Sequence, residues 1–251
     1  MSGAVTALWR HPIKSHGREA LTGVTLAAGQ ALPWDRCWAV QHDNSTGPTT
    51  GWSSYQNFMI GTRTPGLAGL WADLDEGAGR VHLRHDRLGQ FSLSPDDDAE
   101  AKAFFAWLAP ILPENRAQPR RIVRAGTRGM TDTDFPSVSI MNASSHRAVS
   151  QRLGRPLEPE RWRGNIWFDG LAPWEEFDWI GRHVRIGGAV LAVQDRIERC
   201  LHTAANPRTG ERDADTLGTL ETGWGHRDFG VYAEVVEGGP VAPGDSVEVL
   251  A

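Results

Sequence analysis

The chain has 251 residues, 40% of them hydrophobic and 23% charged, which is typical of a globular protein with a sizeable core. The net charge of -5 argues against nucleic acid as the main partner, because phosphate backbones select basic surfaces. No apolar run approaches the roughly 20 residues of a membrane span, and the first residues lack a signal-peptide pattern. We therefore expect a reduced, cytoplasmic protein that binds neither nucleic acid nor membrane.

Short β-forming segments dominate the first third of the chain. Strands are predicted at 4–9, 21–26 and 36–41, with Pro12 ending the first and a turn at Gly29. Segments 67–74 and 81–83 predict a hairpin closed by the sequence DEGAG. Short strands at regular spacing indicate a barrel or a sandwich.

The pattern becomes helical after Pro95. Acidic residues are followed by four apolar residues at helical spacing, Ala101, Phe104, Phe105 and Leu108. A basic connector at 116–128 and a second helix at 144–153 are predicted next. Strands return at 165–168, 184–186 and 189–193, and two more, VYAEVVEGG and DSVEVLA, end the sequence. The fold class is therefore mainly β, rich in barrel strands, with a few inserted helices.

Cys200 is the first candidate for chemistry. It follows a predicted strand, opens a polar loop, and lies near Arg196 and Arg199, which favour a thiolate. A thiolate is a soft ligand for a metal centre, and it also suits persulfide chemistry. A free structural thiol is the alternative. Zinc is disfavoured because Cys200 and His202 supply only two of the three or four ligands required. Cys37 lies within a strand and is predicted to be a core residue.

Two further groups of residues suit an anionic ligand. Lys14 and Ser15 follow a strand end in a loop stiffened by Pro12, where a Lys and backbone N–H groups can reach a phosphate. Arg163 and Asn165 flank a glycine that lets the backbone approach a ligand. Arg36 lies at the start of another predicted strand, and its planar guanidinium group can donate two parallel hydrogen bonds to phosphate or carbonyl oxygens. A solvated Lys and surface ion pairs are the alternatives.

Together these segments resemble the MOSC family, named for the C-terminal domain of molybdenum cofactor sulfurase, and most closely its members related to the mitochondrial amidoxime-reducing component. The resemblance covers nearly the whole chain. It rests on seven motifs in order: LWRHPIKS, DRCWAV, DFPSVSIMNASS, RWRGNIWFDG, RIERCLHTAANPRTGERD, FGVYAEVV and GDSVEV.

The resemblance implies two interlocked subdomains with a molybdenum–pterin cofactor between them. It implies an N-terminal β-barrel domain at 1–95, a helical and basic connector at 96–125, and a MOSC domain at 126–251. Cys200 would ligate molybdenum directly and be the catalytic residue. The cofactor would be held by Lys14, Ser15, Arg36, Asp134, Arg163, Asn165, Arg199 and Tyr232.

The sequence also departs from the family pattern. The segment TDTDFP leaves the hydroxyl contacts expected at 134–135 in doubt, and Gly164 stands where some relatives have proline. We expect neither the iron–sulfur domain of some bacterial relatives nor the domain through which the sulfurase binds pyridoxal phosphate. A separate electron-donor protein, a flavin or iron–sulfur reductase, would then be required.

The leading expectation is a molybdenum oxidoreductase that reduces small N-hydroxylated organic substrates, such as amidoximes or hydroxylamines. A non-catalytic cofactor carrier, or a protein that carries a persulfide on Cys200, is the alternative. A third reading is a β-barrel binding module that has a groove lined by Trp side chains and no metal.

Overall fold

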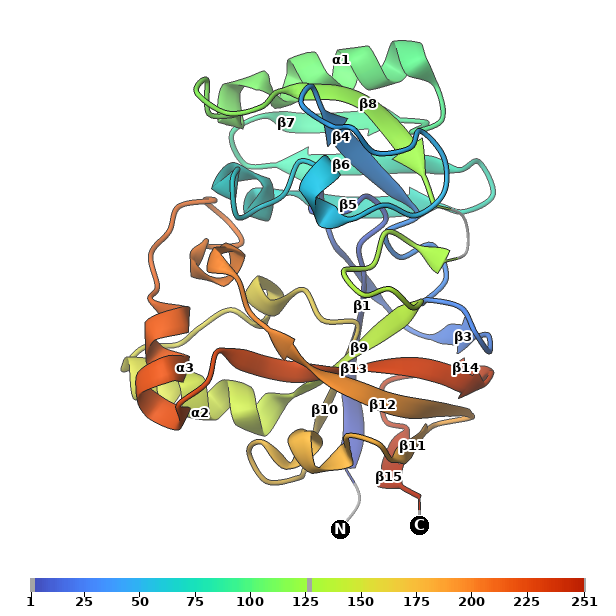
Figure 1. Ribbon diagram of the computed structural model, residues 1–251, viewed down its shortest axis with the longest axis vertical. Helices are drawn as coiled ribbons and strands as arrows, with labels where there is room; N and C mark the ends of the chain where they lie inside the picture. Colours follow the sequence, from blue (N-terminus) through green and yellow to red (C-terminus); the bar gives the residue numbers. More distant parts are fainter. Residues whose placement is uncertain (1–2, 126–127, 251) are drawn as a thin grey trace.

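The computed structural model of the chain describes residues 3–125 and 128–250. Two bodies are stacked along its longest axis, with α1 at one end and both chain termini at the other (Figure 1). The described part is mostly strands, with three α-helices, and the predicted mainly β fold is confirmed.

A closed barrel forms the larger body. Its seven strands follow the order β10-β9-β13-β12-β11-β15-β1, and a pairing between β1 and β10 closes the ring. The bounds are β1 Gly3–Arg10, β9 Ser137–Asn142, β10 Ile166–Asp169, β11 His183–Ile186, β12 Ala189–Glu198, β13 Asp228–Glu237 and β15 Ser246–Val249. All neighbours are antiparallel except β9 and β10.

The barrel interior is filled by side chains that alternate along these strands. Val138 and Ile140 of β9 pack with Val231 and Ala233 of β13 in one buried cluster. Because side chains in a strand point to opposite faces in turn, residues two apart share the inner face. A short strand β2, Glu19–Leu21, extends the sheet beside β1.

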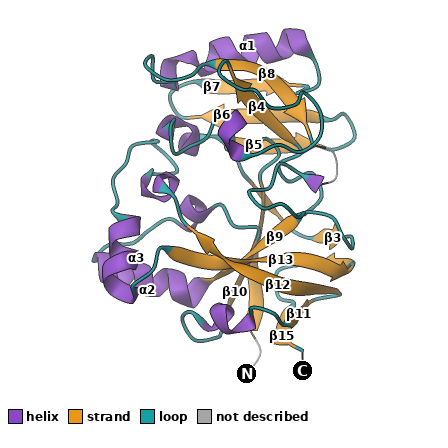
Figure 2. Cartoon of the chain, viewed as in Figure 1, coloured by secondary structure: helices purple, strands orange, loops and turns teal. Residues whose placement is uncertain are grey.

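The smaller body consists of two small sheets and one helix. Strands β5 Trp71–Asp75, β6 Arg80–His85 and β7 Gly89–Leu93 form a meander, and β4 Trp38–His42 pairs with β8 Pro119–Arg124. Helix α1, Asp98–Leu108, covers them at the end of the molecule (Figures 1 and 2). Its buried Phe104 packs with Trp38 in the core of this body.

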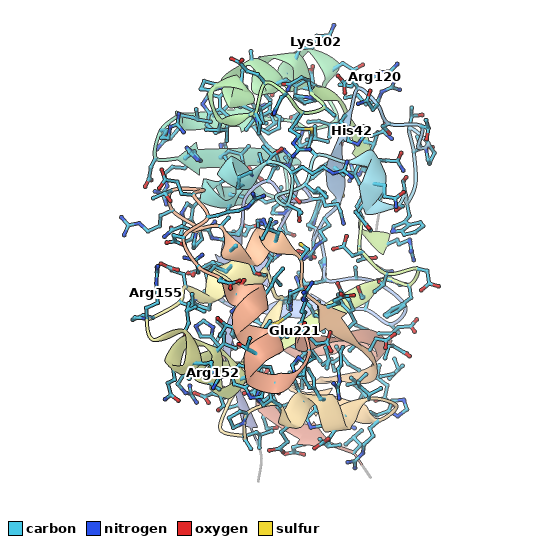
Figure 3. All side chains as sticks on the ribbon, turned by 60° about the vertical axis from the view of Figure 1, so that its left-hand side comes forward. His42, Lys102, Arg120, Arg152, Arg155 and Glu221 are labelled. Atoms are coloured by element: carbon cyan, nitrogen blue, oxygen red, sulfur yellow. The ribbon has the colours of Figure 1, made fainter. Side chains whose placement is uncertain are left out.

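Two further helices cover the barrel. Helices α2 Ala143–Leu153 and α3 Thr216–Trp224 lie side by side (Figure 2). Asn142 caps α2 by accepting from the Ser144 N–H at 2.9 Å, and Gly154 ends it in the left-handed conformation. The exposed Arg152, Arg155 and Glu221 cover the outside of this region (Figure 3).

Short elements complete the chain. Strands β3 Val24–Leu26 and β14 Gly239–Val241 pair with one another. Single turns of 3₁₀ helix lie at Tyr55–Asn57, Pro65–Gly69, Ala109–Ile111, Pro159–Trp162, Glu175–Trp179 and Leu201–Ala204. No described helix is long and apolar enough to cross a membrane.

Most predicted elements are confirmed, and the differences are local. The predicted strand 21–26 is two strands, β2 and β3, and the first half of the predicted segment 67–74 is a 3₁₀ turn. The basic connector contains strand β8, while β7, β9 and α3 were not predicted. Strand β1 lies in the barrel built mainly from residues after 137, so the two bodies are interlocked as predicted. The domain boundaries at 95 and 125 stay a prediction.

Replacing Ile140 by alanine should destabilise the barrel. Ile140 is fully buried between β13 and β10, and a cavity at such a site costs about 2–5 kcal/mol of unfolding free energy. Val236→Ala is the control, because Val236 is 40% exposed. Denaturant unfolding measures both variants, and equal midpoints would contradict the assignment of Ile140 to the core.

Candidate functional site

Backbone hydrogen bonds join two predicted motifs that lie far apart in sequence. The chain leaves β1 at Arg10 and runs along the segment that enters β4. The Arg36 N–H donates to the His11 carbonyl at 2.7 Å, and the Lys14 N–H donates to the Trp38 carbonyl at 2.7 Å. The loop HPIKS and the pair Asp35–Arg36 are therefore fixed side by side.

Three of the predicted site residues have left-handed backbone conformations. Their φ values are 63° at Ser15, 51° at Arg36 and 49° at Arg163. The left-handed region costs a non-glycine residue about 1–2 kcal/mol. Such strain gathers at binding and catalytic sites, where surrounding structure enforces a particular side-chain direction. Ser15 makes no side-chain hydrogen bond within the described residues, so its assignment to the site stays a prediction.

Lys14 is buried and paired with a residue that was not predicted. Its Nζ donates to the Met130 carbonyl and to Asp132 Oδ1, each at 2.6 Å. Burial lowers the pKa of Lys14, whereas the Asp132 carboxylate opposes this effect. Asp132 is half exposed at its side chain and lines a small open pocket. Lys14 therefore fixes the position of Asp132, one of the residues that line the pocket.

Arg36 lies beside a fully buried carboxylate. It forms an ion pair with Asp35, which also accepts from the His11 N–H at 2.7 Å. Burial alone would lower the pKa of Arg36, but the carboxylates of Asp35 and Asp132 raise it overall. The pKa of Asp35 is held well below its usual range by Arg36 and His11 against the effect of burial.

Arg163 makes fewer hydrogen bonds with its side chain than Lys14, Arg36 or Arg199. Its guanidinium makes one hydrogen bond to the described residues, from Nη2 to the Gly17 carbonyl at 3.2 Å. Burial, followed by the charges of Arg36 and Arg18, lowers the pKa of Arg163 to about 9. An anion placed between Arg36 and Arg163 would offset this repulsion and use the remaining donors.

The pocket beside Arg36 has a polar lining. Its residues are Arg36, Thr131, Asp132, Ser137, Ser139, Asn165 and Tyr232. Asn165 is buried and ties β9 to β1: its Oδ1 accepts from Ser139 Oγ at 2.8 Å, and its Nδ2 donates to the Trp9 carbonyl at 3.1 Å. Burial, aided by Asp132, raises the pKa of Tyr232 to about 12, so Tyr232 keeps its proton at neutral pH.

Cys200 lies just past the end of β12 and is exposed, unlike the buried Cys37. Its Sγ accepts a hydrogen bond from Thr62 Oγ1 at 3.0 Å. Arg199 and Cys200 directly follow β12, which pairs with the strand that contains Tyr232 of the pocket. Arg199 is held by the carbonyls of Phe229 and Trp162, each 2.8 Å from a guanidinium nitrogen.

The structure brings most of the predicted residues together. Arg36, Asn165 and Tyr232 line the pocket, Lys14 bonds to Asp132 in its lining, and Arg36 bonds to the Arg163 carbonyl. Arg199 and Cys200 follow β12, the strand paired with that of Tyr232. Asp134 is exposed and does not line the pocket, whereas Asp132 does. The sequence TDTDFP offers two aspartates two residues apart, and nothing in it distinguishes them. The functional roles of all these residues stay predictions.

The fold and the polar pocket define a class of β-barrel protein in which several cationic side chains lie near a free thiol. The sequence profile of the MOSC domain matches residues 130–248. The molybdenum cofactor sulfurase of Anopheles gambiae is 39% identical over 134 residues, which cover 49% of this chain and 17% of the relative. That of Drosophila grimshawi is 31% identical over 121 residues, covering 45% and 16%. The resemblance to the MOSC family is therefore supported over residues 130–248, a little under half of the chain.

The relationship to these sulfurases covers only part of each protein. The chain spans about a sixth of the length of the curated relatives that it matches. The crystal structure of the YUAD protein from Bacillus subtilis superposes with a TM-score of 0.50 at 13% identity, covering 99% of this chain and 96% of that one. This similarity concerns the fold alone.

Buried neutral histidines should make the protein less stable in mild acid. Burial lowers the pKa of His11 to about 3 and of His16 to about 4, below the unfolded value near 6.5. The unfolded state therefore binds more protons, and each histidine reduces stability by up to about 1.4 kcal/mol per pH unit as pH falls from 6.5 toward its folded pKa.

Denaturant unfolding between pH 7 and pH 5 tests this expectation. His16→Gln should reduce the loss of stability on acidification, because it removes one titrating group. His183→Gln is the control, since His183 is exposed. An identical pH dependence in wild type and His16→Gln would show that His16 does not carry this effect.

Proposed function

We propose that this chain binds a molybdenum–pterin cofactor between its two bodies, with Cys200 as the protein ligand to the metal. The observation that carries the proposal is an exposed thiol beside a cluster of buried and half-buried cations. Lys14, Arg36, Arg163 and Arg199 face the two carboxylates Asp35 and Asp132, so the region has more positive than negative charge. The molybdenum cofactor sulfurases among the relatives support the choice of cofactor.

The donor set fits such a cofactor better than a bare metal ion. The described residues contain no group of three or more His, Cys, Asp or Glu side chains able to hold a metal. A single thiolate suffices if the metal arrives with ligands of its own, as it does in a pterin dithiolene. Arg163 has unused donors for the phosphate of the same molecule.

We further propose that the chain is an oxidoreductase acting on small N-hydroxylated compounds. Reduction of such a compound takes two electrons and two protons, breaks the N–O bond and releases water. The cofactor would supply the two-electron chemistry. A separate flavin or iron–sulfur reductase would supply the electrons. The protein would bind the cofactor through the cations and leave the Cys200 side of the site open to substrate.

Cys200→Ala should abolish molybdenum binding without unfolding the chain. Cys200 is exposed and packs in no core cluster, so its removal leaves no cavity. Cys37→Ala is the matched control: Cys37 is buried beside Trp38, so this variant should lose stability but keep the metal. Elemental analysis of protein from a host that makes the cofactor decides the matter. Equal molybdenum in wild type and Cys200→Ala would refute the ligand assignment.

Arg163→Met should weaken cofactor binding about tenfold or more. A charge-assisted hydrogen bond contributes roughly 1.5–3 kcal/mol, and 1.4 kcal/mol is a factor of ten. The fold should tolerate the change, since it also removes repulsion on Arg36. Arg116→Met, at an exposed position, is the control. Molybdenum retained after extensive dialysis measures the effect. Equal retention in both variants would argue against a role of Arg163 in binding the anionic cofactor.

The activity itself is tested on the loaded protein with a chemical reductant replacing the unknown donor. Reduction of a simple amidoxime or hydroxylamine that disappears in Cys200→Ala would support the oxidoreductase. A loaded protein that stays inert but passes its cofactor to an empty molybdoenzyme would instead be a carrier.

A further inference from the structure

The Cys200 loop lies against a turn of the other body. Segment 60–70 of the smaller body contacts loop 200–212, which follows β12 of the barrel. Arg212 Nη2 donates to the Thr62 carbonyl at 2.6 Å. Arg18 bridges the same two segments, donating to the Ala68 carbonyl at 2.7 Å and to the Pro207 carbonyl at 2.6 Å. These bonds fix the turn relative to the loop.

Glycines allow the two segments to approach closely. A Cβ atom at Gly61 would overlap the imidazole of His202, two residues after Cys200. A Cβ at Gly210 would lie 2.6 Å from Gly66 Cα, closer than real Cβ atoms come. The glycines therefore allow the turn and the loop to touch at this seam, and the hydrogen bonds from Arg212 and Arg18 oppose their separation.

Thr62 makes the one hydrogen bond that the Cys200 thiol has within the described residues. Its hydroxyl is 3.0 Å from Sγ. The Thr62 backbone is anchored by Arg212, and a β-branched side chain has few χ1 choices. The Thr62 hydroxyl therefore donates to the Cys200 sulfur from a fixed position on the smaller body.

We infer that Thr62 is a positioning residue for Cys200, holding the sulfur across the seam in the direction needed to ligate a metal. The inference rests on the proposed function. It gives the smaller body a role in orienting the metal ligand, in addition to the cations that would bind the cofactor. Groups that hydrogen-bond to a metal ligand orient it and tune its basicity, and their loss typically reduces metal affinity or activity 10–100-fold. The thiol site is then complete only when the two bodies meet.

A crosslink tests the contact without any cofactor. Thr62→Cys should form a disulfide with Cys200 under mild oxidation, because the atoms of the two side chains already touch. Arg63→Cys is the matched control: it is the exposed next residue and should leave Cys200 free. Mass spectrometry of the oxidised proteins identifies the linked peptides. Absence of the 62–200 link, or equal linkage from position 63, would overturn the inference.

Metal retention tests the consequence. Thr62→Val keeps the shape but removes the donor and should lower retained molybdenum about tenfold, whereas Thr62→Ser should restore it. Wild-type retention in Thr62→Val would overturn the positioning role even if the crosslink forms. If wild type itself holds no molybdenum, the proposed function fails, and the crosslink alone still decides whether Thr62 holds the thiol.

Discussion

The continuous segment from β1 through the following loop belongs to both bodies, and the site depends on it. Residues 3–10 are hydrogen-bonded into the barrel through β10 and β15. Directly afterwards, Ile13 and Lys14 pair with Trp38 at the start of β4 in the smaller body. Because only a few residues separate the two sets of bonds, they limit how far one body can move relative to the other. Lys14 therefore has a defined position relative to barrel residues such as Asn165.

The charges of the region support the proposed anionic ligand. Burial opposes the charge of Lys14, Arg163 and Arg199, and each has a lowered pKa. Asp35 and Asp132 offset part of this cost, but Arg36 and Arg163 still repel one another. Stabilising such a group of cations for structure alone would be inefficient, because apolar residues of similar size often serve as well. A chain of net charge -5 that gathers cations here favours a bound anion.

The sequence predicted the elements well where period and turn chemistry were clear, as at helix α1 with its acidic start and at the β5–β6 hairpin. It did not predict β8, because three arginines in PRRIVR suggest a solvated connector, whereas pairing with β4 decides the structure. It also did not predict β9: Ser137–Ile140 alternates polar and apolar residues, but the alternation ends at Met141, and all six residues of the strand are buried.

The sequence named candidate residues for the site but gave no information on their contacts. Motifs indicated Lys14, Arg36 and Arg163, yet only the fold shows that Asp132 rather than Asp134 lines the pocket. Thr62 gives no signal in the sequence at all, since an isolated threonine in a turn is ordinary. Its partner Cys200 is 138 residues away, and the contact exists because two loops from different bodies meet through glycines. Such pairings depend on how the bodies are joined, which local sequence pattern does not encode, so the residues that orient a ligand are harder to predict than the ligand itself.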